Sequence, residues 1–393
     1  MSQSLSHSPS TSSREPWVDA LRALALLGVF VVNAMGYPSA PSYPMPLGAS
    51  IPVDSTVAIW LNGFLAIVFQ GKAYPLLCFL FGYSLCCIAR QTRGNIQSVK
   101  LRIKRRQFKL LLIGVLHGIF IYFGDVLTVY AICGLIAGRW VNLKPVKLLR
   151  ILKRLMILNI VLYIILVLGG FVMWVDGKST DTQYAQNILE NFISIKTYSQ
   201  FFDLNFFSYL ESLVSTLFLF PIFLCLTVAG VFVRRFNLFT MRKQARRFWS
   251  IHLTTGHFIF ALILNICVGI FIAIEQSNAS VYKLPAIVIT SIPINIWLVA
   301  AAVAAGMRYW HKKQFLPAWV YWLAPAGKHT LAMYLFLSFA LMLSGGVFFN
   351  FQVSSLFKLI VVICVWVCAI NLAKLATQRN YRDPIARWLS GSR

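Results

Sequence analysis

Residues 110–130 read LLLIGVLHGIFIYFGDVLTVY, and this apolar stretch contains one histidine, His117, and one aspartate, Asp125. An ionisable side chain at membrane depth is costly, so such a residue usually marks a place where something polar is handled. Histidine can also take or release a proton near neutral pH. We therefore take His117 as the first candidate for chemistry.

The composition is that of a membrane protein. Of the 393 residues, 59% are hydrophobic and 12% are charged, whereas soluble domains carry about 25% charged residues. The net charge of +25 comes from basic residues in alternate loops, so we exclude nucleic acid as a partner. The eight cysteines all lie in apolar runs, a placement that predicts neither a disulfide framework nor a metal site.

The apolar stretches are about 20 residues long, the length of a helix that crosses a hydrocarbon core of roughly 30 Å. The fold predicted is all-α, a polytopic transmembrane bundle of about ten helices. The clearest spans are residues 18–37, 148–175, 206–233, 251–274, 284–306, 330–349 and 356–376.

The charges of the loops predict the orientation. Residues 90–109 carry eight Lys or Arg and no acid. The other acid-free basic loops are 139–154, 234–247 and 308–328. Four acids lie in the loop 176–205. Basic loops stay in the cytoplasm, so both termini are predicted to be cytoplasmic, in a bacterial inner membrane.

This orientation gives a single transmembrane domain at 17–377, a disordered cytoplasmic tail at 1–16 and a cytoplasmic C-terminal tail at 378–393. The Pro-rich loop 38–53 contains no Lys or Arg and is placed outside, which requires one broken traversal: 56–69, a break at Gly71–Lys72, then 74–89. The alternative is two full spans with the Pro-rich loop inside. Two short spans follow, 110–123 and 126–138, with an outer turn at Gly124–Asp125.

His117 and Asp125 allow two interpretations. His117 is either a proton acceptor or a histidine that holds two helices together by a hydrogen bond. Asp125 either orients and charge-stabilises the imidazole, as in a His–Asp dyad, or serves the turn after Gly124. Their spacing alone does not decide between these roles.

The first span adds a polar stripe. Asp19 and Arg22 are three residues apart and can pair on one helix face, and Asn33 follows Arg22 by eleven residues, close to three turns. Arg22 also fits a cation that snorkels to the interface. Further candidates are Lys72 at the break and two tyrosines, Tyr122 and Tyr130.

Several stretches, in chain order, carry a resemblance: VDALRALALLGVFVVN, GKAYPLLCFLFGYSL, RRQFKLLLIGVLHGIFIYFGDVLTVYAICGL, LAPAGKHTLAMYLFLS and RDPIARWL. They resemble the YeiB-like family, bacterial multi-pass membrane proteins of unknown function. That family is distantly similar to integral-membrane acyltransferases, such as the lysosomal heparan N-acetyltransferase, which move an acyl group from acyl-CoA to an acceptor across the membrane.

Two positions depart from the related enzymes. Their first helix carries an Arg and, eleven residues later, a catalytic His; here the pair is Arg22 and Asn33. The C-terminal signature is usually Gly-Pro followed by an acid, whereas this chain has Asp383-Pro384 and no acid after the proline. The base would therefore have to come from His117.

The resemblance implies an acyltransferase that uses acyl-CoA as co-substrate, with no bound cofactor, and an extracytoplasmic or lipid-linked acceptor such as a glycan or a small molecule. Asn33 would donate to the oxyanion. A basic cluster would hold the CoA phosphates or, alternatively, anchor topology and bind anionic lipid; its members are Arg102, Lys104, Arg105 and Arg106.

Two rival classes remain. The same polar residues fit a proton-coupled transporter or exporter without covalent chemistry, and they also fit a scaffold protein whose polar groups only join helices. Membrane lipids are partners in every case, and assembly into a homo-oligomer is left open.

The topology predicts how single cysteines react in intact cells. A membrane-impermeant thiol reagent should label a cysteine at Ser179, in the acidic loop, and should spare one at Ser98, in the basic run. Labelling at position 98 but not at 179 would invert the orientation.

Overall fold

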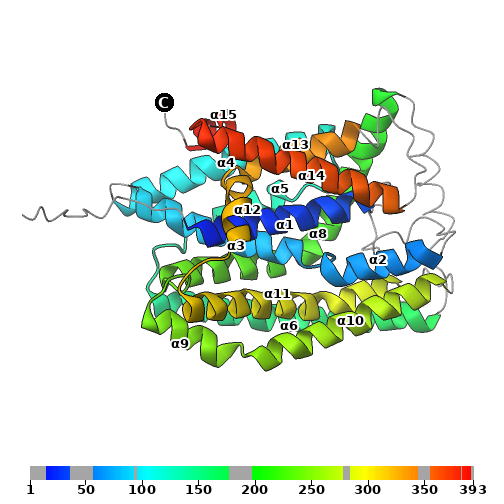
Figure 1. The fold of residues 1–393 in the computed structure, drawn as a ribbon, viewed down its shortest axis with the longest axis horizontal. Coiled ribbons are helices and arrows are strands. Elements are labelled where there is room, and N and C mark those ends of the chain that lie inside the picture. Colours follow the sequence, from blue (N-terminus) through cyan, green and yellow to red (C-terminus); the bar gives the residue numbers. More distant parts are fainter. Residues whose placement is uncertain are drawn as a thin grey trace, which may run out of the picture.

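The computed structural model describes residues 15–35, 56–92, 95–176, 197–277, 284–343, 355–381 and 383–390. Every regular element in these ranges is a helix, and the long helices run side by side along one axis (Figure 1). Seven helical segments are long and apolar enough to cross a membrane. The predicted all-α transmembrane bundle is confirmed.

The first helices in chain order are α1 (Pro16–Met35), α2 (Thr56–Val68), α3 (Ala73–Gln91), α4 (Ile96–Phe120), α5 (Leu127–Ala137) and α6 (Pro145–Asp176). The remaining ones are α8 (Tyr198–Arg235), α9 (Lys243–His252), α10 (Thr255–Ser277), α11 (Leu284–Lys313), α12 (Ala318–Lys328), α13 (Thr330–Met342), α14 (Ser355–Gln378) and α15 (Pro384–Ser390). The ends of two predicted spans, 36–37 and 344–349, and the tail 1–14 lie outside the described residues.

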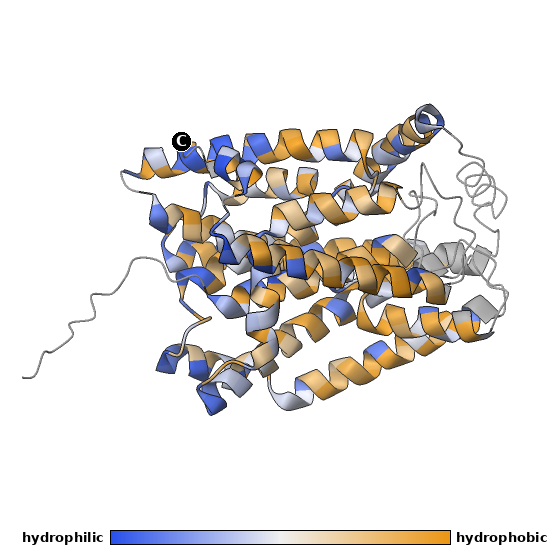
Figure 2. Ribbon diagram, turned by 45° about the horizontal axis from the view of Figure 1, so that its top comes forward, coloured by the Kyte–Doolittle hydropathy of each residue, from blue (hydrophilic) through white to orange (hydrophobic). Residues whose placement is uncertain are grey.

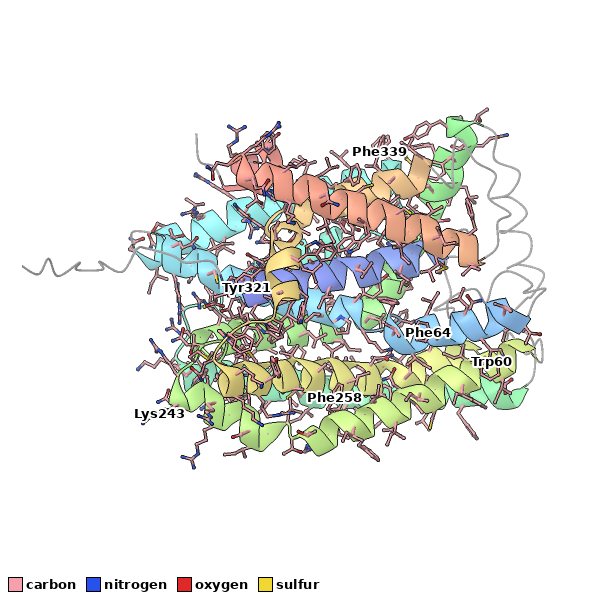
Figure 3. The ribbon with its side chains drawn as sticks, in the orientation of Figure 1. Trp60, Phe64, Lys243, Phe258, Tyr321 and Phe339 are labelled. Atoms are coloured by element: carbon pink, nitrogen blue, oxygen red, sulfur yellow. The ribbon has the colours of Figure 1, made fainter. Side chains whose placement is uncertain are left out.

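The bundle is built around α1. This helix contacts α3, α12, α13 and α14, and most of its side chains are buried. The outer helices keep apolar side chains on their outer surfaces, as Trp60, Phe64 and Phe339 show (Figure 3). Exposed apolar side chains of this kind are what a helix needs where it meets lipid.

The polar residues gather toward one end of the bundle. Figure 2 shows hydrophilic residues concentrated at the end that carries the C-terminus. The first described residues of α1 and the last of α15 lie at that same end (Figure 1), as does α9. This arrangement agrees with the alternation of basic and non-basic loops; that this end is the cytoplasmic one stays a prediction.

The traversal formed by α2 and α3 is broken, as predicted. Residues 69–72 form a turn between the two helices, and α3 continues in the general direction of α2 (Figure 1). α2 packs against α10, whereas α3 packs against α8 and α1. The alternative of two full antiparallel spans is therefore wrong.

The turn predicted at Gly124–Asp125 is present between α4 and α5; that it faces the outer side of the membrane stays a prediction. α4 and α5 form a hairpin whose turn is buried, with Tyr122, Phe123 and Asp125 each at most 6% exposed. α5 has 11 residues and is therefore about 16 Å long, too short to cross the core. The hairpin enters and leaves at one end, so it preserves the even number of crossings that the loop charges require.

Two segments predicted as basic loops contain helices. The loop 234–247 leads into the short helix α9, and the loop 308–328 contains α12. Gly327 of α12 lies so close to α1 that a Cβ there would overlap the carbonyl oxygen of Asp19. This helix depends on a tertiary contact that the charge pattern does not reveal.

The helices α3 and α8 approach each other closely through two glycines. A Cβ at Gly82 would overlap the backbone oxygen of Thr227, and one at Gly230 would overlap that of Phe79. Small residues permit such close backbone contact between membrane helices.

Replacing either Gly82 or Gly230 with Ala should lower the stability of the protein by about 1–3 kcal/mol, because the added methyl groups meet backbone that cannot move aside. The measurement is the thermal unfolding midpoint of the detergent-solubilised protein. Gly169→Ala is the matched control, because no atom lies within 4 Å of a Cβ there. Equal midpoints for all three variants would contradict the close packing of α3 and α8.

Candidate functional site

The buried turn between α4 and α5 is organised by Asp125. Its Oδ1 accepts a hydrogen bond from the backbone N–H of Leu127 at 3.2 Å, and its Oδ2 accepts one from that of Thr128 at 2.8 Å. These are among the first N–H groups of α5, which have no partner within the helix. Asp125 therefore does serve the turn, as one of the two interpretations expected.

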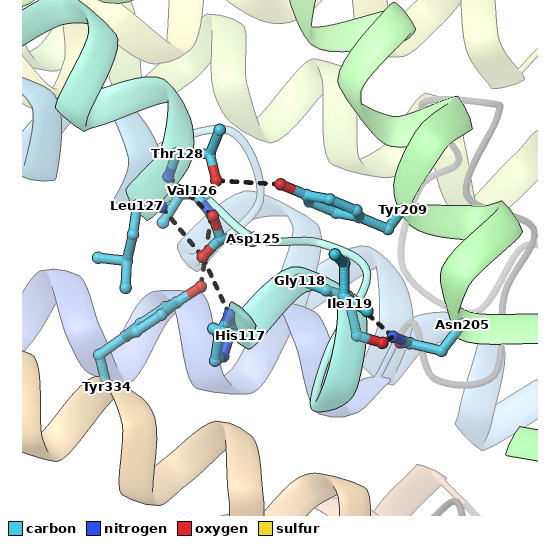
Figure 4. A network of polar contacts seen from close by, with 10 residues as sticks. All are labelled: His117, Gly118, Ile119, Asp125, Val126, Leu127, Thr128, Asn205, Tyr209 and Tyr334. Carbon is cyan, nitrogen blue, oxygen red and sulfur yellow. Dashed lines mark hydrogen bonds and ion pairs between the residues drawn. The ribbon is translucent and has the colours of Figure 1, made fainter. Parts of the chain in front are cut away.

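The same carboxylate also contacts His117. The distance between His117 Nδ1 and Asp125 Oδ1 is 2.9 Å, and the two side chains are 1% and 0% exposed. Asp125 thus combines both expected placements, the turn residue and the partner of the imidazole (Figure 4).

This contact determines the tautomer of the imidazole. A carboxylate only accepts hydrogen bonds, so Nδ1 carries the proton and Nε2 of the neutral ring carries the lone pair. Nε2 is buried and has no hydrogen-bond partner among the described residues. The atom that could accept a proton is therefore not used by the fold.

Side chains of two other helices, α8 and α13, form hydrogen bonds with the backbone of the hairpin. The amide of Asn205 in α8 donates to the carbonyl oxygens of Gly118 and Ile119 at 2.8 Å each, which satisfies carbonyls at the end of α4. The backbone N–H of Val126 donates to the Tyr334 hydroxyl at 3.4 Å. Non-helical backbone inside a membrane protein needs such partners.

The imidazole packs beside an aromatic ring. The ring centroids of His117 and Tyr334 are 4.9 Å apart. Gly114, one turn before His117, leaves room for the dyad, since a Cβ there would lie 2.9 Å from Asp125 Oδ2. The hydroxyls of Thr128 and Tyr209 are 3.1 Å apart and extend the network to α8 (Figure 4).

Three network residues were not among the candidates: Asn205, Tyr209 and Tyr334. Their chain positions are far from the hairpin, so no local spacing links them to it. A weak signal existed for Asn205, because Thr197 and Gln200 form a capping box that starts α8. That motif would have moved Asn205 from the predicted loop into a helix.

The polar residues of α1 lie in two separate parts of the structure. Arg22 pairs with Asp19 and donates to the Ser84 hydroxyl at 2.9 Å. Asn33 accepts a hydrogen bond from the Tyr74 hydroxyl at 3.3 Å. Eleven residues of helix span about 16 Å, so these residues do not form one site.

Four tyrosines lie in or against one hydrophobic cluster: Tyr74, Tyr122, Tyr130 and Tyr334. The Tyr130 hydroxyl donates to the Tyr74 carbonyl oxygen at 3.4 Å, and Tyr122 stacks on Phe123 with centroids 4.9 Å apart. Tyr334 is near enough to Asp125, Tyr74 and Tyr122 to interact with them electrostatically. Tyr74 and Tyr334 thus lie in or against one hydrophobic cluster, and Asn33 contacts this cluster through Tyr74.

Lys72 does not join this cluster. Its ammonium donates to the carbonyl oxygens of Ala66 and Gln70 at 3.0 and 2.8 Å and to Asn295 Oδ1 at 2.8 Å. Gly71 adopts a φ of 72° in the turn, a conformation that glycine tolerates. Lys72 therefore ties the end of α2 to α11 at the break.

The basic cluster lies on the first part of α4. Arg102, Lys104 and Arg105 are exposed, whereas Arg106 is only partly exposed. Among the described residues, no group of three or more His, Cys, Asp or Glu has the arrangement of a metal site.

Comparisons with known proteins find relatives only among proteins without an assigned function. Residues 233–387 match the family described as "Protein of unknown function (DUF418)". The uncharacterized protein YeiB of Escherichia coli (strain K12) is 32% identical over 173 residues, which cover 43% of this chain and 40% of the relative. The uncharacterized protein YxaH of Bacillus subtilis (strain 168) is 29% identical over 146 residues, 35% of each chain.

A third relative is the uncharacterized 39.9 kDa protein in the amylase 3'region of Bacillus acidopullulyticus, 30% identical over 119 residues, 30% of this chain and 32% of the relative. Each alignment thus spans well under two thirds of the relative. No solved structure matches. These relatives confirm the predicted resemblance to the YeiB-like proteins.

Asp125→Asn should destabilise the hairpin by about 1–3 kcal/mol, because an amide cannot accept all three hydrogen bonds that the carboxylate accepts. Either the N–H of Thr128 or His117 Nδ1 loses its acceptor. The measurement is the thermal unfolding midpoint, with Asp203→Asn as control, because Asp203 is exposed on α8. A midpoint equal to that of the control would show that the turn does not depend on Asp125.

Proposed function

We propose that this protein is a membrane-embedded acyltransferase that moves an acyl group from acyl-CoA to a hydroxyl or amine of an extracytoplasmic or lipid-linked acceptor. The supporting observation is the state of His117: Asp125 binds Nδ1, and Nε2 is buried without a partner among the described residues. This is the arrangement of a general base whose orientation is held by a carboxylate.

In the reaction, His117 Nε2 takes the proton of the acceptor group while the acceptor oxygen or nitrogen attacks the thioester carbonyl carbon. The tetrahedral intermediate collapses with cleavage of the carbon–sulfur bond. The imidazolium returns the proton to the leaving thiolate. The products are an acyl ester or amide and free CoA.

The remaining roles follow the positions of the side chains. Asp125 holds the tautomer and stabilises the imidazolium. Asn33, which contacts the tyrosine cluster through Tyr74, would donate to the oxyanion. The basic end of α4 would receive the CoA phosphates from the cytoplasm of a bacterial cell.

A purely structural role for His117 does not explain why its Nε2 has no hydrogen-bond partner among the described residues. A histidine that only joins helices should use its hydrogen-bonding atoms for that purpose, because an unpaired buried polar atom costs free energy. In this structure only Nδ1 of His117 takes part in a hydrogen bond.

A second candidate function is a proton-coupled carrier. The broken traversal α2–α3 and the buried hairpin are discontinuous membrane segments. In many transporters, segments of this kind form the substrate-binding site. Such a protein would use His117 for proton uptake without covalent chemistry.

The test compares His117→Gln and His117→Ala in proteoliposomes supplied with radiolabelled acetyl-CoA and bacterial lipid and glycan extracts. Both variants should lose roughly 10²–10⁴-fold in label transfer, because an amide or a methyl group cannot take the proton. His257→Gln is the control: His257 is exposed and contacts Thr254 at 2.9 Å.

A fully active Gln variant would exclude general-base catalysis at this position. Wild-type protein that transfers no label but carries protons across the vesicle membrane, with the transport lost in His117→Gln, would favour the carrier instead.

A further inference from the structure

One arginine of the basic cluster differs from its neighbours. Arg102, Lys104 and Arg105 are exposed, as cations that snorkel to an interface are. The guanidinium of Arg106 instead has a nitrogen, NH1, that is buried and lacks a hydrogen-bond partner among the described residues. A buried charge without a partner is costly, so it calls for an explanation.

The charges around Arg106 increase that cost. Its guanidinium is close enough to those of Arg22 and Arg102 to feel their positive charge. The carboxylate of Asp19 is already paired with Arg22, and the Ser84 hydroxyl accepts from the same guanidinium. Among the described residues, no carboxylate pairs with Arg106, and the charges that act on it are both positive.

We propose that Arg106, together with Arg22, forms an inward-facing anion site between α1, α3 and α4 that binds a phosphate group of acyl-CoA. Guanidinium groups suit this ligand, because their planar donors bind two phosphate oxygens at once. The identity of the donor as acyl-CoA rests on the proposed function, whereas the anion site itself rests on the unpaired guanidinium.

The position of the site along α4 fits such a ligand. Arg106 and His117 are eleven residues apart on one helix, about 16 Å along its axis. Acyl-CoA is itself divided in this way, because the flexible pantetheine arm separates its diphosphate from the thioester. One helix would therefore bind the phosphates at its basic end and place the thioester near Nε2 of His117 in the bundle.

Binding of coenzyme A to the purified, detergent-solubilised full chain tests the proposal by titration calorimetry. Arg106→Gln should weaken binding at least tenfold, because it removes the inward-facing donors. Arg154→Gln removes the same charge from an exposed residue of α6, outside the basic cluster, and should change binding less than threefold. Equal losses in the two variants would overturn the site.

Ligand-free stability provides a second measurement. Arg106→Gln should raise the thermal unfolding midpoint relative to Arg154→Gln, because it removes a buried charge that lacks a partner. A lower midpoint would mean that Arg106 serves only the fold, and it would contradict the proposal.

The source of the phosphate is tested in nanodiscs of phosphatidylglycerol or phosphatidylcholine and with inorganic pyrophosphate in detergent. If wild type binds no coenzyme A but pyrophosphate or phosphatidylglycerol raises its midpoint, and Arg106→Gln abolishes that rise, the anion site stands and the acyl-CoA donor fails. If no anion distinguishes Arg106→Gln from Arg154→Gln, the proposed site is overturned, whatever the transfer assay with His117 shows.

Discussion

One buried carboxylate, that of Asp125, accepts hydrogen bonds from three N–H groups, and the rest of the structure depends on these contacts. A chain that turns inside a membrane protein must satisfy its free backbone groups without water. Asp125 does so for the start of α5 and, with one of the same oxygens, Oδ1, holds the imidazole of His117. The turn and the candidate base therefore share one anchor, so the hairpin could not form as observed without also orienting the histidine.

The two interruptions of the bundle show how differently ionisable residues can be used. At the break between α2 and α3, Lys72 gives its three N–H groups to three oxygens, so nothing remains for a substrate. At the hairpin, Asn205 and Tyr334 complete the backbone hydrogen bonds, and His117 keeps one ring nitrogen unused. The fold alone explains the contacts of Lys72, but it does not explain the unused ring nitrogen of His117.

Much of the fold could be predicted from apolar length and loop charge, including the broken traversal. The buried hairpin could not, because a short apolar stretch does not reveal whether its turn reaches the surface. His117 and Asp125 were recognisable as polar residues in apolar surroundings. Asn205 and Tyr334 were not, because their contacts join residues distant in the chain. The difference between Arg105 and Arg106 depends on which side of α4 faces its neighbours.

The most direct test of the central claim is the tautomer of His117, read by nitrogen-15 NMR of histidine-labelled protein, with His117→Gln to assign the signals. The account predicts a proton on Nδ1 and an unprotonated Nε2 in the neutral ring. In Asp125→Asn, the amide can donate to Nδ1 and should move the proton to Nε2 in part of the molecules. A wild-type imidazole with its proton on Nε2 would contradict the account, because that nitrogen could not act as the base.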